Sequence, residues 1–112
     1  MSRDLTLYLE DILKSVDKIE RYTNGLSQQE MVEDERTFDA VALNLQIIGE
    51  AVKHIPDAYR EIYSQIEWRK IAGMRDFIAH VYFSLDDEII WDVVQNKLND
   101  LKNCILLMKS DL

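Results

Sequence analysis

Three side chains that together could act on a phosphate lie in the short stretch from Gly73 to Tyr82. Arg75 is a permanent cation, His80 carries an imidazole, and Tyr82 carries a phenol. A guanidinium binds phosphate oxygens through a fork of donors, and an imidazole serves as general base or acid. The three residue types therefore predict metal-free cleavage of a phosphodiester, in which a ribose 2′-hydroxyl attacks the adjacent phosphorus. That reaction requires RNA, and DNA is not an expected substrate.

Helix geometry limits how these groups can meet. At 100° per residue, Arg75 and Tyr82 fall on one stripe of a regular helix, whereas His80 points about 140° away from Arg75. We therefore predict that the helix loosens near residues 79–82 and that His80 and Tyr82 lie at or just past its end. Asp76 is a candidate partner for either Arg75 or His80. Because one histidine cannot readily be both base and acid, a symmetric homodimer that shares one cleft is the natural arrangement.

Simpler interpretations of the same residues remain open. An arginine and a histidine on a helical surface are usually solvated, and a tyrosine such as Tyr82 is by default an amphipathic packing residue. His54, just before Pro56, is interpreted as a C-terminal helix cap rather than a ligand. Glu50 could face the site, but a solvated position is the default. Two distant histidines without cysteine partners argue against a zinc site, and we expect no metal and no cofactor.

The bulk composition fits one cytoplasmic domain spanning residues 1–112. No apolar run approaches the roughly 18 residues of a membrane span, and the N-terminus lacks the features of a signal peptide. The single cysteine, Cys104, is interpreted as a small core residue. A net charge of −8 argues against a protein that grips nucleic acid with its whole surface. Between Lys53 and His80, however, five basic residues outnumber four acidic ones, so an anion could be received locally.

Apolar spacing predicts helices that would hold this stretch in place. The clearest pattern runs from Phe38 to Ile55, where apolar residues alternate at intervals of three and four, as in helical bundles. Gly49 lies inside this helix at a cost of about 1 kcal/mol relative to alanine, which indicates close approach of another helix. Pro56 should stop this helix and open the next.

The remaining elements are read in the same way. Ser27 and Glu30 have the spacing of a capping box, and Ser84 with Asp87 gives a second N-cap signal. Further helices are predicted over residues 3–23, 57–66, from 67 onward, and 86–109. Together they predict an all-α, up-and-down bundle of four main helices plus a short extra helix.

The sequence also resembles a known family. Arg75, His80 and Tyr82 match the Arg-x4-His-x-Tyr signature of the HEPN superfamily, and more narrowly of the HepT-like (DUF86) toxins. The stretches Asn44-Leu-Gln-Ile-Ile-Gly-Glu-Ala51 and Trp68-Arg-Lys-Ile-Ala-Gly-Met-Arg75 resemble two further characteristic stretches of that family, and the helical layout agrees over the whole chain. Asp76 stands where many members carry asparagine.

The resemblance implies a specific biology. It implies a dimeric helical bundle with metal-independent endoribonuclease activity at a shared cleft, in which Arg75 and His80 are catalytic. It also implies a partner, a nucleotidyltransferase antitoxin of the MntA type, which uses ATP and Mg²⁺ to transfer AMP onto Tyr82. A nucleotide attached there would occupy the place of the substrate and repel RNA phosphates. Two alternatives stay open: a non-catalytic subunit that binds a nucleotidyltransferase or a nucleotide, and a purely structural homodimer.

Overall fold

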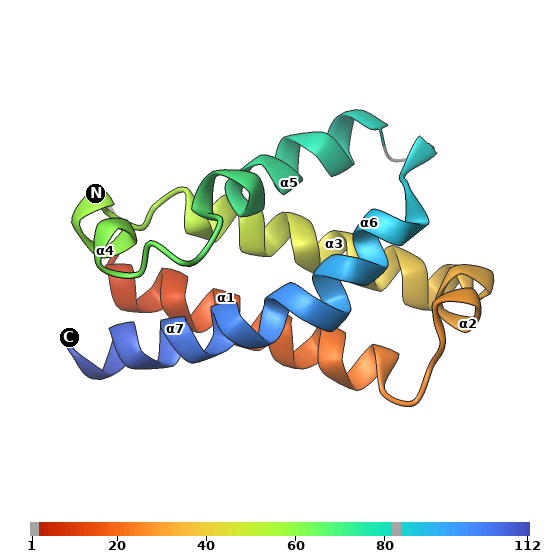
Figure 1. Cartoon of the computed structure of the whole chain (residues 1–112), viewed down its shortest axis with the longest axis horizontal. Coiled ribbons are helices and arrows are strands. Elements are labelled where there is room, and N and C mark those ends of the chain that lie inside the picture. Colours follow the sequence, from red (N-terminus) through yellow and green to blue (C-terminus); the bar gives the residue numbers. More distant parts are fainter. Residues whose placement is uncertain (1–2, 82–83) are drawn as a thin grey trace.

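The protein is an up-and-down bundle of helices, as the sequence predicts. The computed structural model describes residues 3–81 and 84–112. Its helices are α1 (Leu5–Thr23), α2 (Gln28–Glu33), α3 (Glu35–Val52), α4 (Asp57–Ile62), α5 (Trp68–Val81), α6 (Asp87–Asp92) and α7 (Leu98–Ser110). A π-helical turn, η2 (Val93–Lys97), joins α6 to α7, so these three segments form one long helix. With α1, α3 and α5 it makes the four main helices, while α2 and α4 close opposite ends of the bundle (Figure 1).

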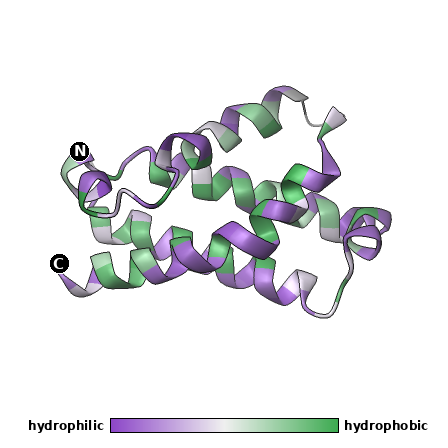
Figure 2. Ribbon diagram, in the orientation of Figure 1, coloured by the Kyte–Doolittle hydropathy of each residue, from purple (hydrophilic) through white to green (hydrophobic). Residues whose placement is uncertain are grey.

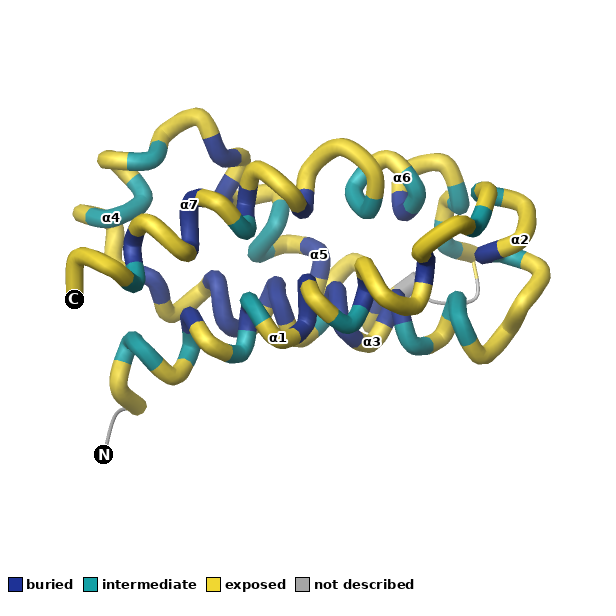
Figure 3. The backbone as a smooth tube through the Cα atoms, turned by 90° about the horizontal axis from the view of Figure 1, so that it is seen from below, coloured by how far each residue is buried: buried dark blue, intermediate teal, exposed yellow. Residues whose placement is uncertain are grey.

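The core lies between α1, α3 and the long C-terminal helix. Buried positions face inward along these helices (Figure 3), and the same stripes are hydrophobic in Figure 2. The predicted apolar pattern of α3 is confirmed, since four of its members are buried: Val41, Leu45, Ile48 and Val52. Cys104 is buried, as predicted, and burial raises the pKa of its thiol to about 11. Among the described residues, no helix is long and apolar enough to cross a membrane.

Local capping explains where several helices begin and end. Gly25 adopts a positive φ of 77° just after α1, a conformation that favours glycine. The capping box of Ser27 and Glu30 is confirmed, with both reciprocal hydrogen bonds present. The prediction that Ser84 is an N-cap is wrong, because Asp86 caps α6 by accepting bonds from the amides two and three residues further on. A carboxylate at this position also interacts favourably with the positive end of the helix.

The end of α3 differs from the prediction. The helix stops at Val52, four residues before Pro56, and Pro56 becomes the N-cap of α4. The Arg60 side chain binds the terminal carbonyls, donating to the oxygens of Val52 at 2.7 Å and Ile55 at 3.1 Å. The capping role predicted for the His54 side chain is therefore wrong, because the longer Arg60 side chain reaches back from α4 to satisfy these carbonyls.

Gly49 brings α3 and α5 into backbone contact, as the sequence predicts. A Cβ atom at this position would lie 2.9 Å from the amide nitrogen of Arg75 and 2.9 Å from the carbonyl oxygen of Ile71. The most extensive interhelical contacts of α5 are with α3. The backbone at Arg75 is therefore positioned by a contact that only glycine permits.

Replacing Gly49 with alanine is expected to destabilise the protein. Alanine gains about 1 kcal/mol of helix propensity, but overpacking against an immobile backbone costs about 1–3 kcal/mol. We therefore expect a net loss, measured as a lower urea midpoint at an unchanged slope. Gly73→Ala is the matched control, because Gly73 lies on α5 with open space around it and should gain stability. Equal stability of the two variants would contradict this account of Gly49.

Candidate active site

Three of the residues predicted for the site lie on the second half of α5, and Arg75 and His80 among them do not converge as expected. Arg75, Asp76 and His80 are exposed on this helix, and Tyr82 lies outside the described residues. His80 is the next-to-last residue of α5, as predicted for a helix end. The predicted loosening near residues 79–82 is wrong over residues 79–81, because α5 stays helical through Val81, and residue 82 lies outside the described residues. With regular geometry, Arg75 and His80 point to different sides of the helix.

Asp76 connects these two sides. Arg75 donates a hydrogen bond from Nη1 to Oδ1 of Asp76 at 2.9 Å, so Arg75 is its direct partner. The hydrogen bond from Arg75 lowers the pKa of the Asp76 carboxyl, and the charges of Lys53 and His80 lower it further. His80 stands one turn beyond Asp76 on the same face. Asp76 is therefore ionised at neutral pH and interacts electrostatically with both Arg75 and His80.

The end of α3 supplies three more charged or polar groups. Glu50 lies with Oε2 3.7 Å from Nε of Arg75 and with Oε1 3.7 Å from Nε2 of His54. Lys53 extends its Nζ to 3.6 Å from Oδ2 of Asp76 and 3.9 Å from Oε2 of Glu50. Glu50 is 55% exposed, which agrees with the solvated position expected by default, and its carboxylate also lies near Arg75. We call Glu50, Lys53, His54, Arg75 and Asp76 the charged cluster.

Sequence reasoning missed Lys53 as a member of the site and gave His54 a different role. Both follow Glu50 by about one turn, which is the signal that could have placed them beside it. The ring of His54 stacks on Tyr8 of α1, with centroids 4.1 Å apart and planes 5° from parallel. The guanidinium of Arg3 lies 4.8 Å from the centroid of the Tyr8 ring. Nothing in the local sequence predicts that α1 reaches the end of α3 at this point.

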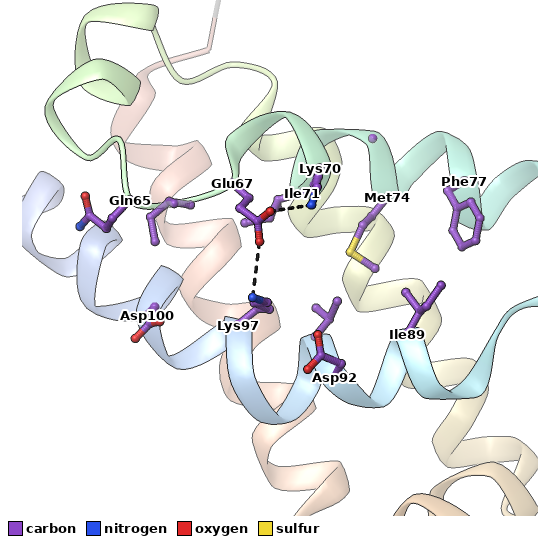
Figure 4. Close-up of a pocket in the computed structure, with 13 residues that line it drawn as sticks. Gln65, Glu67, Lys70, Ile71, Met74, Phe77, Ile89, Asp92, Lys97 and Asp100 are labelled. Carbon is purple, nitrogen blue, oxygen red and sulfur yellow. Dashed lines mark ion pairs between the residues drawn. The ribbon is translucent and has the colours of Figure 1, made fainter.

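A pocket lies between α5 and the long C-terminal helix, apart from the charged cluster (Figure 4). It has a volume of about 550 Å³, and Glu67 spans it by pairing with Lys70 at 2.7 Å and Lys97 at 3.4 Å. Its lining combines apolar and acidic residues. The apolar residues include Ile71, Met74, Phe77, Ile89 and Val93, and the acidic residues include Asp92 and Asp100. Because it contains neither arginine nor histidine, it fits acid–base chemistry on a phosphate less well than the charged cluster does.

The charged cluster offers groups suited to an anion at the surface. Arg75 and Lys53 are exposed cations on neighbouring helices, and their side chains are 48% and 36% exposed. Two carboxylates balance them, so an incoming phosphate would compete with Glu50 and Asp76 for Arg75. Within the described residues, no three His, Cys, Asp or Glu side chains gather in an arrangement that could hold a metal ion.

Comparison with known proteins identifies the family. The model of the family described as "Ribonuclease HepT-like" matches residues 12–108, and the chain belongs to this family, which confirms the resemblance drawn from the sequence. A putative RNase of Methanocaldococcus jannaschii is 39% identical over 108 residues, which cover 96% of this chain and 89% of that protein. A protein of Thermococcus cleftensis described as a probable ribonuclease HepT is 37% identical over 102 residues, which cover 91% of this chain and 93% of that protein.

A further relative has a different organisation. A protein of Methanocaldococcus jannaschii described as a gamma-glutamylcyclotransferase and putative RNase is 37% identical over all 112 residues of this chain, which account for 50% of its length. The helical domain therefore also occurs as one part of a larger protein. No solved structure gives a significant match to this chain.

Proposed function

We propose that this protein is a metal-independent endoribonuclease, with Arg75 and His80 as its catalytic residues. Membership of the ribonuclease HepT-like family supports RNA as the substrate class. The observation that carries the proposal is the position of the exposed Arg75. Its backbone is held by the contact with Gly49, and a second cation, Lys53, lies nearby. His80 follows about one turn further along the same helix, near its end. This arrangement presents a phosphate-binding group and a proton-transfer group on the same stretch of helix.

The reaction is an intramolecular transesterification of an RNA phosphodiester. His80 takes the proton from a ribose 2′-hydroxyl, and that oxygen attacks the neighbouring phosphorus. Arg75 binds the non-bridging oxygens and stabilises their increased negative charge. The bond from phosphorus to the 5′-oxygen then breaks, and that oxygen receives a proton. The products are a 2′,3′-cyclic phosphate and a new 5′-hydroxyl.

Two copies of the chain would supply the second proton-transfer group. On regular α5, His80 is turned away from the Arg75 of its own chain. A symmetric dimer can place the His80 of one copy near the Arg75 of the other, and it also brings two imidazoles into one cleft. One imidazole then acts as base and the other as acid. The exposure of both residues supports this proposal.

The activity of a toxin ribonuclease requires control. The Arg-x4-His-x-Tyr spacing supports Tyr82 as the acceptor of AMP from a nucleotidyltransferase antitoxin of the MntA type. The adenylyl phosphate would add negative charge near Arg75 and occupy the place of an RNA phosphate. In this proposal the chain is the toxin of a toxin–antitoxin pair.

A second candidate is a non-catalytic subunit that binds a nucleotidyltransferase or a nucleotide. It is favoured by the two carboxylates that neutralise Arg75 and by the net charge of −8. Purified protein, incubated with mixed RNA and EDTA, separates the two candidates. Fragments ending in 2′,3′-cyclic phosphate support the nuclease, whereas intact RNA together with binding of a nucleotide or of the nucleotidyltransferase supports the second candidate.

Replacing Asp76 with asparagine is expected to lower the KM for RNA. The substitution removes a negative charge that holds Arg75 at 2.9 Å, so a substrate phosphate meets less competition. For an exposed pair the effect is about 1.4- to 5-fold. It should shrink as salt rises, because exposed charges are screened. The measurement is KM at low and at high ionic strength.

Glu20→Gln is the matched control for Asp76→Asn. It removes the same charge and also breaks a surface ion pair, here with Lys102 at 3.4 Å, but on α1 away from the charged cluster. A similar decrease in KM for both variants would mean that only overall charge matters. An unchanged KM for Asp76→Asn alone would show that this carboxylate does not compete with RNA.

A further inference from the structure

The stack of Arg3, Tyr8 and His54 forms a layered aromatic surface at one edge of the charged cluster. His54 covers one face of the Tyr8 ring at 4.1 Å, so the guanidinium of Arg3, 4.8 Å from the same centroid, lies over the other face. Arg3 is held in turn by Asp11, whose Oδ2 accepts a hydrogen bond from Nη1 of Arg3 at 2.6 Å. The stack therefore ends at His54, whose side chain is 43% exposed even though Tyr8 covers one of its faces.

This stack adjoins the group proposed to bind phosphate. One carboxylate, that of Glu50, lies 3.7 Å from His54 Nε2 and 3.7 Å from Arg75 Nε. The imidazole ring and the guanidinium are thus separated by the width of a single carboxylate group. In a nucleotide, a ribose separates the base from the phosphate by a comparable interval. A nucleotide with its phosphate at Arg75 can therefore direct its base toward the exposed part of the His54 side chain.

We propose that Tyr8 and His54 form a nucleobase-binding platform beside the phosphate site of Arg75. Unpaired bases bind proteins by stacking on aromatic side chains, and the contact tolerates every base because each has a π face. Arg3 completes the stack from the other side through a cation–π contact. The proposal rests on the proposed function and deepens it, because it selects single-stranded RNA with an unstacked base next to the bound phosphate.

The competing explanation is purely structural. Tyr8 packs against the core, and its stack with His54 could simply fix the turn after α3 to α1. That explanation predicts a change in stability when Tyr8 is altered and no effect on the choice between ligands with and without a base. A comparison of such ligands therefore distinguishes the two explanations.

The test compares adenosine 5′-monophosphate with ribose 5-phosphate, which lacks only the base. Both are titrated into the full-length protein while NMR follows the ring protons of His54 and the Nε–H of Arg75. We expect both compounds to shift the Arg75 signal and only the nucleotide to shift the His54 signals. The nucleotide should bind at least about 5-fold more tightly, the lower bound for stacking of one base on an aromatic ring.

Two variants of His54 make the test specific, because His54 is the ring that the base would contact. His54→Leu keeps an apolar side chain but removes the ring, and it should abolish the preference for the nucleotide over ribose 5-phosphate. His54→Phe keeps an aromatic ring and should retain the preference. In both variants the affinity is read from the Arg75 signal, and thermal unfolding checks that they are folded. Equal affinity for the two ligands in the unaltered protein, or a full preference in His54→Leu, would overturn the platform.

The outcomes also separate this proposal from the nuclease proposal. RNA cleavage together with an Arg75 response to both ligands, but no base preference, removes the platform alone. A base preference without RNA cleavage keeps the platform and removes the nuclease. If neither ligand moves the Arg75 signal and RNA stays intact, both proposals fail.

Discussion

His80→Ala is expected to slow RNA cleavage by about 10²–10⁴-fold, the usual contribution of a general acid or base. His80 is exposed in the last turn of α5, so its removal should leave the stability of the bundle nearly unchanged. Arg75→Ala is expected to cost about 10²–10³-fold through lost stabilisation of the transition state. Initial rates on a labelled RNA, with unfolding curves for each variant, give these values.

The control for both variants is Arg69→Ala. Arg69 is an exposed arginine on the same helix and lies outside the charged cluster, so cleavage should continue at close to the original rate. If all four proteins cleave RNA equally, the nuclease is a contaminant and the enzymatic proposal is withdrawn.

Mixing the two inactive variants tests whether the site is shared between copies. When Arg75 of one copy works with His80 of the other, a mixed dimer of His80→Ala and Arg75→Ala chains contains one intact pair of these residues, although it has a single imidazole. Random mixing should then restore activity above that of either variant alone, and at most about a quarter of the original activity in a two-fold symmetric dimer. No recovery after the subunits have demonstrably exchanged would place both residues in the same chain's site.

Tyr82→Phe is expected to abolish adenylylation completely, because the phenol oxygen is the proposed acceptor. With the cognate nucleotidyltransferase, ATP and Mg²⁺, intact-mass analysis should show one added adenylyl group on the original chain and none on the variant. The variant should also keep cleaving RNA in the presence of the partner, whereas the original chain becomes inactive as the modification proceeds.

The control is Tyr59→Phe, which removes a hydroxyl from a partly buried tyrosine on α4. This variant should be modified and silenced like the original chain. If Tyr82→Phe gains AMP to the same extent, the modification lies elsewhere and the proposed switch is wrong.

The helical framework could be predicted because its signals are local. The apolar spacing of α3, the capping box of Ser27 and the glycine at position 49 each act through neighbours in the chain or through one buried face. The early end of α3 could not be predicted in this way. It depends on Arg60 reaching back to two carbonyls from the next helix, a contact that only the folded chain brings about.

The candidate site was predicted less completely than the fold. Arg75 and His80 were identified by residue type and spacing, but α5 stays helical through residues 79–81, where the sequence predicted a loosening, and the two side chains therefore diverge. Lys53, and the stack of His54 on Tyr8, require the packing of α1 and α5 around the end of α3. Spacing along one helix carries no information on such contacts between distant segments.

The position of Glu50 has a consequence for how the site would respond to a ligand. A single carboxylate lies within 3.9 Å of a guanidinium, an ammonium and an imidazole. An anion that displaces it from Arg75 also changes the surroundings of Lys53 and His54, although it touches neither. Binding of an anion at Arg75 therefore alters the electrostatic surroundings of Lys53 and His54 without requiring a movement of the backbone.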